Sequence, residues 1–114
     1  MDGYKFKMGW MLVMFDLPVT TAKRRKHALE FRNFLLDEGY LMVQLSVYVR
    51  DCVSYNRMQT QMRRIKANLP PEGDVRAVYV TQAQWERMFI MHGPPDPDGN
   101  DPPPEEFPDQ LLLF

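Results

Sequence analysis

Cysteine is nearly absent from this 114-residue sequence, which contains only Cys52. A single cysteine excludes an intramolecular disulfide framework and is typical of proteins of the reducing cytosol. The cysteine clusters that hold structural zinc are missing for the same reason. The two histidines, His27 and His92, lack the spacing of metal ligands. A disulfide scaffold and a zinc-stabilised fold are therefore both excluded.

Long hydrophobic runs are also missing. No apolar stretch reaches the length that spans a bilayer, and residues 1–7 lack the apolar core of a signal peptide. The apolar content of 45% is nevertheless ordinary for a globular protein. We therefore expect one soluble, cytoplasmic domain.

Basic residues are absent from residues 93–114, and this absence divides the chain in two. That segment holds six acidic residues and seven of the ten prolines. Residues 1–92 hold fourteen basic and nine acidic residues, a net charge of +5 that the whole-chain value of −1 conceals. We expect a folded domain over 1–92 and an acidic, Pro-rich linker over 93–109. Residues 110–114 should form a C-terminal strand that docks on a sheet, either its own or that of a partner subunit.

Hydrophobic periodicity predicts the elements of the folded part. Helices are expected over 22–38 and 54–69, a short turn over 82–86, and strands over 10–15, 41–50, 75–80 and 88–91. Residues 41–50 alternate strictly, so that two sets of side chains face opposite ways. We expect the odd-numbered set to pack on helices and the even-numbered set to form a sheet-to-sheet interface. The order indicates an α+β, ferredoxin-like β-α-β-β-α-β sandwich with an extra C-terminal strand.

The segment 10–26 carries the strongest chemical signal. An apolar strand ends in one carboxylate, Asp16, and the next helix opens with four cations, Lys23, Arg24, Arg25 and Lys26. Cations oppose the positive end of the helix dipole, so their presence there favours an anion, most simply a phosphate. The alternatives are that Asp16 caps a turn and that the cations form a solvated face. Asp16 beside a phosphate-binding helix start suggests nucleic acid and a divalent metal.

The sequence resembles the CRISPR-associated endoribonuclease family, the smaller of the two universal spacer-adaptation proteins. The resemblance spans residues 9–114 and rests on segments in the family's order, and residues 87–93 resemble members from type II systems. These segments are Phe-Asp-Leu-Pro at 15–18, the basic run at 23–26, Phe-Leu-Leu-Asp-Glu-Gly-Tyr at 34–40, Gln-Leu-Ser-Val-Tyr at 44–48, Val-Tyr-Val-Thr at 78–81 with Gln84, and the terminal strand.

The resemblance implies a homodimer in which two Asp16 carboxylates share Mg²⁺ or another divalent cation such as Mn²⁺. It makes Asp16 the metal-binding and catalytic candidate, and it places Ser46 and Tyr48 on the strand that flanks the site. It makes the basic residues Lys23, Arg24, Arg25, Lys26 and Arg32 nucleic-acid contacts. Met42 departs from relatives that carry Arg there, so an electrophilic helper is missing at that position.

Two functions remain open at this point. In the first, the protein is a basic dimer that binds protospacer duplex DNA and bridges CRISPR integrase subunits. In the second, it is primarily a metal-dependent phosphodiesterase that cleaves RNA or DNA. The cationic surface favours the first function. The second is less favoured, because one carboxylate per chain is a poor magnesium site.

Overall fold

The computed structural model describes residues 8–94 and 98. Their elements follow the order β1 (Gly9–Asp16), α1 (Ala22–Asp37), β2 (Leu41–Gln44), β3 (Val47–Cys52), α2 (Tyr55–Ala67), β4 (Asp74–Thr81) and α3 (Gln82–Glu86). This order confirms the predicted ferredoxin-like β-α-β-β-α-β sandwich, in which residues 41–52 supply the second and third strands. Within this part of the chain, no helix is both long and apolar enough to cross a membrane.

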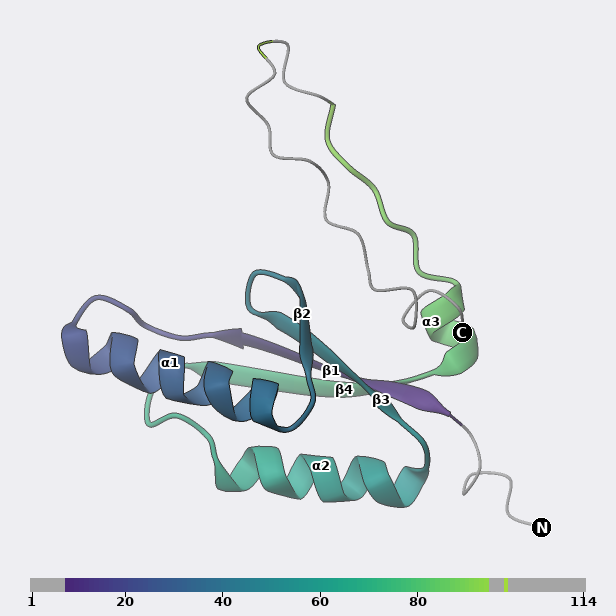
Figure 1. Ribbon diagram of the computed structural model, residues 1–114, viewed down its shortest axis with the longest axis horizontal. Coiled ribbons are helices and arrows are strands. Elements are labelled where there is room, and N and C mark those ends of the chain that lie inside the picture. Colours follow the sequence, from purple (N-terminus) through teal and green to yellow (C-terminus); the bar gives the residue numbers. More distant parts are fainter. Residues whose placement is uncertain (1–7, 95–97, 99–114) are drawn as a thin grey trace.

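One antiparallel sheet forms the centre of the domain, with the strand order β2-β3-β1-β4. The two long helices, α1 and α2, lie on the same side of this sheet (Figure 1). The central strand β1 pairs along its length with β3 on one side and β4 on the other. The sheet therefore has one helix-covered face and one that we call the open face.

The helix-covered face contains the main hydrophobic core. Met11 and Val13 of β1 are fully buried there against Phe31 and Leu35 of α1 and Ile65 of α2. The ring of Phe15 packs edge-on against Phe31, with ring centroids 5.3 Å apart. This burial supplies most of the hydrophobic free energy that holds the helices on the sheet.

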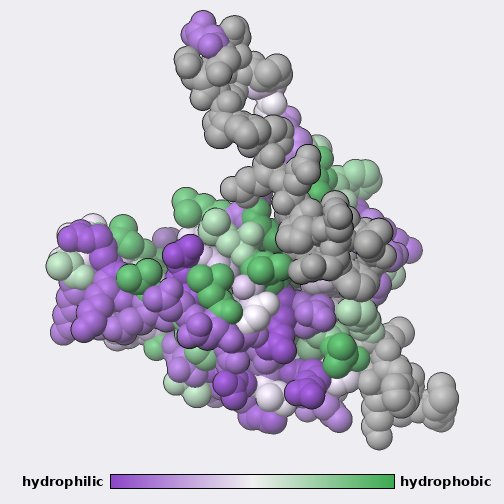
Figure 2. Space-filling model, viewed as in Figure 1, coloured by the Kyte–Doolittle hydropathy of each residue, from purple (hydrophilic) through white to green (hydrophobic). Residues whose placement is uncertain are grey.

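The open face carries a smaller cluster. Trp10 and Trp85 stack with centroids 4.6 Å apart and bury Val49 beside them. A groove of about 510 Å³ runs from this cluster to residues 88–92. Other apolar side chains of this face stay in solvent, with Val78 42% and Leu41 36% exposed. Figure 2 shows hydrophobic side chains gathered over the β2–β3 hairpin, while the visible surface over α1 and α2 is mostly hydrophilic.

The helix ends follow from local side-chain chemistry. Thr21 caps α1 by accepting a hydrogen bond from the Arg24 N–H, and Ser54 caps α2 through the Arg57 N–H. Helix α1 ends at Asp37, and Gly39 follows its C-cap with a φ of +90° that lets the Tyr40 N–H donate back to the Leu35 carbonyl. Both long helices were predicted within two residues of these ends.

The prediction of one strand over 41–50 is wrong. The segment is a hairpin in which Leu45 and Ser46 form the turn between β2 and β3. Ser46 adopts a φ of +62° there, and a bulge lies between Met42 and Gln44. Because the bulge adds one residue to β2, odd-numbered residues of both strands stay on one face. The alternating pattern therefore continues through the turn without a break.

The faces of this hairpin are the reverse of the prediction. Val43 and Val49, from the odd-numbered set, lie on the open face beside Trp10. Tyr48, from the even-numbered set, is buried in the helix-side core and stacks on Phe15. Burial of the large Tyr48 ring in this core, where its hydroxyl accepts a hydrogen bond from Arg32, favours this orientation.

Two smaller predictions also fail. Residues 82–86 form the short helix α3 rather than a turn, with a capping box between Thr81 and Gln84. Residues 88–91 form no strand, and Phe89 is 85% exposed. The predicted linker over 93–109, apart from residues 93, 94 and 98, and the predicted strand over 110–114 lie outside the described residues.

Candidate nucleic-acid and metal site

Asp16 is the last residue of β1, and its side chain is exposed. Side chains alternate along a strand, so Asp16 shares the open face with Trp10 and Leu12. The preceding residue, Phe15, turns into the helix-side core. The carboxylate therefore stands at the end of the central strand, on the face that α1 and α2 leave uncovered.

A second carboxylate lies directly opposite. In the antiparallel register of β1 with β4, Asp16 pairs with Asp74, the first residue of β4. Directly opposed residues place their side chains on the same face, where two like charges are unfavourable. Asp74 is a functional candidate that was not predicted from the sequence. The alternation of residues 74–80 could have identified it, since Asp74 shares its parity with Val78 and Val80.

Gly73 holds the two strand ends together. Its φ is +93°, and a Cβ built on it would lie 2.6 Å from the main-chain oxygen of Asp16. The same Cβ would lie 2.8 Å from Cδ2 of Leu17. Only glycine accepts both the backbone conformation and the close approach, so residue 73 brings Asp74 beside Asp16.

The donor set of this strand end fits a divalent cation such as Mg²⁺. Mg²⁺ binds through one or two carboxylates and keeps several of its waters. Asp16 and Asp74 supply two such carboxylates from one chain. Within the described residues, no group of three or more acidic, histidine or cysteine side chains converges on a point. A cation here would therefore depend on water, on substrate phosphate or on a second copy of the chain.

The basic start of α1 lies on the other side of the sheet from the Asp16 side chain. Lys23 and Lys26 are exposed, and the first turn of the helix contains no acidic residue. Arg25 donates to the Val19 carbonyl at 3.1 Å. The carboxylate and the cations are neighbours in the sequence, but the alternation of β1 turns the Asp16 side chain away from the helix layer.

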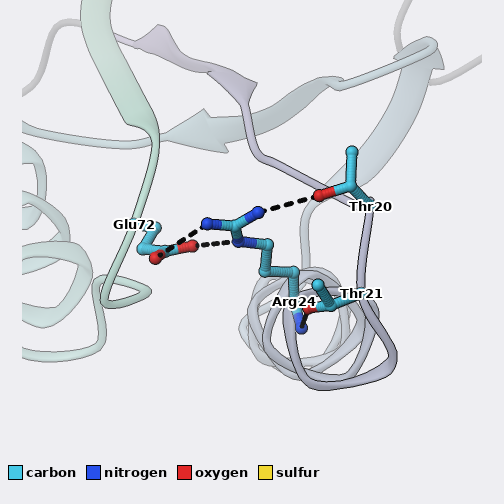
Figure 3. A network of polar contacts seen from close by, with 4 residues as sticks. All are labelled: Thr20, Thr21, Arg24 and Glu72. Carbon is cyan, nitrogen blue, oxygen red and sulfur yellow. Dashed lines mark hydrogen bonds and ion pairs between the residues drawn. The ribbon is translucent and has the colours of Figure 1, made fainter.

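Arg24 is held by protein partners. Its Nε donates to the Glu72 carboxylate at 2.7 Å, and a terminal nitrogen donates to Thr20 at 2.8 Å (Figure 3). The hydrogen bond with Arg24 lowers the pKa of Glu72 below its ordinary value, with a further contribution from the nearby cations. The pair ties the start of α1 to the loop that leads through Gly73 into Asp74.

Arg32 is also engaged with the protein. Its Nε donates to the Tyr48 hydroxyl at 2.8 Å, while the residue as a whole remains exposed. Tyr48 lies on β3 and pairs with Val13, and its side chain is buried on the helix-covered side rather than on the face of Asp16. Ser46 lies in the hairpin turn rather than on a strand, yet its carbonyl accepts the Phe15 N–H at 3.1 Å. Ser46 thus borders the end of β1 through its main chain.

Comparison with known proteins identifies the family. The model of the family described as "CRISPR associated protein Cas2" matches residues 8–88. A protein of Paracidovorax avenae, named CRISPR-associated endoribonuclease Cas2, is 42% identical over 96% of both chains. The protein of that name from Parvibaculum lavamentivorans is 37% identical over 92% of this chain and 99% of its own.

A solved structure supports the fold independently. The structure titled "Crystal structure of cas2" superposes with a TM-score of 0.53 and covers 88% of this chain and 97% of the other. The sequences of the two are only 17% identical, so this likeness concerns the fold alone. With the family match over 8–88 and the near full-length relatives, the chain belongs to the CRISPR-associated protein Cas2 family.

Proposed function

We propose that this protein is a cytoplasmic, homodimeric CRISPR adaptation protein that binds protospacer duplex DNA and bridges integrase subunits during spacer acquisition. We further propose that it has Mg²⁺-dependent nuclease activity. The observation that carries the proposal is the exposed Asp16 carboxylate at the end of a central strand, on an apolar face that the two long helices do not cover.

The open face supports the homodimer. It combines the groove of about 510 Å³ with exposed apolar side chains such as Val78 and Leu41. Apolar surfaces of this kind mark protein interfaces. A two-fold axis that pairs two open faces brings each Asp16 toward its symmetry mate, because the same surface is used by both subunits.

The dimer doubles the number of carboxylates at the centre. Asp16 and Asp74 of each protomer would hold Mg²⁺ or Mn²⁺ between the subunits, where one protomer alone supplies few ligands. A bound divalent cation supplies charge stabilisation to a phosphodiester during cleavage. The relatives' name, endoribonuclease, supports this chemistry.

The basic start of α1 supports the nucleic-acid contact. Lys23 and Lys26 are exposed, and Arg25 donates from one guanidinium nitrogen to the Val19 carbonyl. Arg24 and Arg32 contribute to the same positive surface while bonded to Glu72 and Tyr48. Phosphate contacts from such groups supply affinity that depends on salt rather than on base sequence.

The alternative is a protein that is primarily a metal-dependent phosphodiesterase acting on RNA or DNA. The observation that favours it is Asp74, which gives each protomer a second carboxylate. Under this alternative the integrase is not a partner, and Asp16 acts only in cleavage.

The experiment that separates the two functions compares Asp16→Asn with a charge reversal of residues 23–26. Each variant is assayed for Mg²⁺-dependent cleavage, for duplex affinity and for spacer acquisition with the integrase present. We expect Asp16→Asn to abolish cleavage but retain duplex binding and acquisition, and the charge reversal to abolish acquisition. Loss of acquisition in an Asp16→Asn dimer that still binds DNA would contradict the adaptor function.

A further inference from the structure

The open face also carries a basic residue near Asp16 and Asp74, namely Arg76 on β4. In the register of β1 with β4, Met14 pairs with Arg76 and Asp16 pairs with Asp74. Arg76 thus stands on the same face as Asp16, two residues along β4 from Asp74. Diagonal neighbours in an antiparallel pair lie about 7–8 Å apart, which is within reach of a long side chain.

Arg76 has no protein partner in the part of the chain that the structure describes. No ion pair or side-chain hydrogen bond joins Arg76, Asp16 or Asp74 to another described group. By contrast, Arg24 and Arg64 both reach carboxylates from neighbouring elements. An exposed guanidinium that leaves two nearby carboxylates unpaired has its full set of donors available to an external anion.

The position of Arg76 also answers an electrostatic problem. Asp16 and Asp74 together present two negative charges to a substrate that is itself a polyanion. A phosphodiester that approaches Asp16 must therefore overcome repulsion unless a cation stands beside it. Arg76 is the basic residue that the register of β1 with β4 places next to this pair, and it is exposed.

Met42 does not fill this role. It pairs with Tyr48, whose side chain lies in the helix-side core, so residue 42 belongs to the face opposite Asp16. An arginine at 42 would start on the wrong side of the sheet. Residue 42 therefore does not bear on the open face, where Arg76 is the basic residue supplied by β1 and β4.

We infer that Arg76 binds the phosphodiester held at Asp16, donating from its guanidinium to the non-bridging phosphate oxygens. This inference rests on the proposed function in that it assigns a phosphate contact to the same site. A planar guanidinium matches two phosphate oxygens at once, and Lys lacks this geometry. The contact positions the phosphate over the carboxylates rather than along the helix layer.

The test measures duplex DNA and single-stranded RNA binding in EDTA, so that neither metal nor cleavage enters the result. We expect Arg76→Gln to weaken binding about tenfold and to reduce the slope of log K against log salt by about one. Arg76→Lys should retain the slope and recover only part of the affinity. The matched control is Arg57→Gln, which removes an exposed arginine from α2 and should change both quantities little.

A structural role for Arg76 predicts a different pattern. If Arg76 only offsets repulsion between Asp16 and Asp74, then Arg76→Gln lowers the melting temperature and the second change Asp74→Asn restores stability and the salt slope together. We expect Asp74→Asn to restore stability but leave the slope reduced. A slope equal to that of the wild type in Arg76→Gln, or its full recovery in the double variant, would overturn the inference.

The outcome is independent of the proposed nuclease. Failure of the nuclease appears as Asp16→Asn retaining Mg²⁺-dependent cleavage, whereas failure of the Arg76 contact appears in EDTA as unchanged binding. Asp16→Asn should bind nucleic acid at least as tightly as the wild type in EDTA, since it removes a negative charge beside the phosphate. Weaker binding by Asp16→Asn would overturn the placement of the phosphate next to this residue.

Discussion

The two faces of the sheet differ in how far their side chains are buried and in whether their polar groups have partners. On the helix-covered side, apolar residues are buried and polar groups have partners, as in Arg32 with Tyr48 and Tyr40 with Gln61. On the open side, apolar residues such as Val78 remain exposed, and Asp16, Asp74 and Arg76 bond to no described group. The helix-covered face thus stabilises the domain, while the open face is left for binding.

This comparison predicts the largest effect for truncation on the helix-covered face. Phe31 is 2% exposed, and Phe31→Ala should lower the free energy of unfolding by about 3–5 kcal/mol through lost burial and a residual cavity. Val78→Ala on the open face should cost less than about 1 kcal/mol, because Val78 is 42% exposed. Urea denaturation at low protein concentration measures both. Equal losses would show that the faces do not differ as described.

The next effect concerns the strand ends that carry the two carboxylates. Gly73→Ala forces a Cβ against the Asp16 main chain in a backbone conformation that alanine disfavours, so we expect a loss of about 2–3 kcal/mol. Gly93→Ala is the matched control, because a Cβ there meets nothing within 4 Å. Thermal unfolding of the two variants measures the difference. A Gly73→Ala protein as stable as Gly93→Ala would contradict the close approach of residues 73 and 16.

Association of subunits gives the third prediction. Val78→Lys places a charge in the proposed interface, so the dimer dissociation constant should rise about tenfold or more. Leu29→Lys, on α1 at 52% exposure, introduces the same charge on the helix layer and should leave association unchanged. Sedimentation equilibrium reports both constants. A dimer weakened by Leu29→Lys and not by Val78→Lys would show that the interface lies on the helix layer rather than on the open face.

The helices and most strands of this fold were predictable, whereas the face of the sheet on which the side chains of residues 41–50 lie was not. Thr21 and Gly39 mark the ends of α1 with side-chain chemistry that is visible in the sequence, and α1 was predicted accordingly. The hairpin was missed because its turn, Leu45–Ser46, contains none of the glycine, asparagine or aspartate residues that signal a two-residue turn. The bulge in β2 then preserved the alternation and removed the remaining signal.

The candidate site was predictable only in part for a related reason. Asp16 stands out because it ends an apolar run. Asp74 and Arg76 are recognised as neighbours of Asp16 only from the pairing of β1 with β4, which brings together residues almost sixty positions apart. The partners of Arg24 and Arg32 are likewise long-range, and no local pattern announces Glu72 or the Tyr48 hydroxyl.

The cations of α1 provide the fourth prediction. Lys23→Gln should reduce the slope of log K against log salt for duplex DNA by about one, as expected for the loss of one phosphate contact. Arg24→Gln should reduce it less, because its guanidinium already bonds to Glu72 and Thr20. Fluorescence anisotropy over a salt series measures both slopes. Identical reductions would mean that the ion pair opens at no measurable cost when DNA binds.

Glu72 gives the last prediction, in which the effect is small and its sign depends on pH. The hydrogen bond from Arg24 lowers the pKa of Glu72 from its ordinary 4.5 in the folded protein. The stabilisation by this pair is therefore present above pH 4.5 and is lost as the pH falls through the lowered value. Glu72→Gln should melt slightly below the wild type at pH 7 and level with it at low pH. The same change frees Arg24, so duplex affinity at pH 7 should rise. Glu30→Gln removes an equal charge from an exposed position of α1. An equal rise in its duplex affinity would show that net charge, rather than the release of Arg24, explains the result.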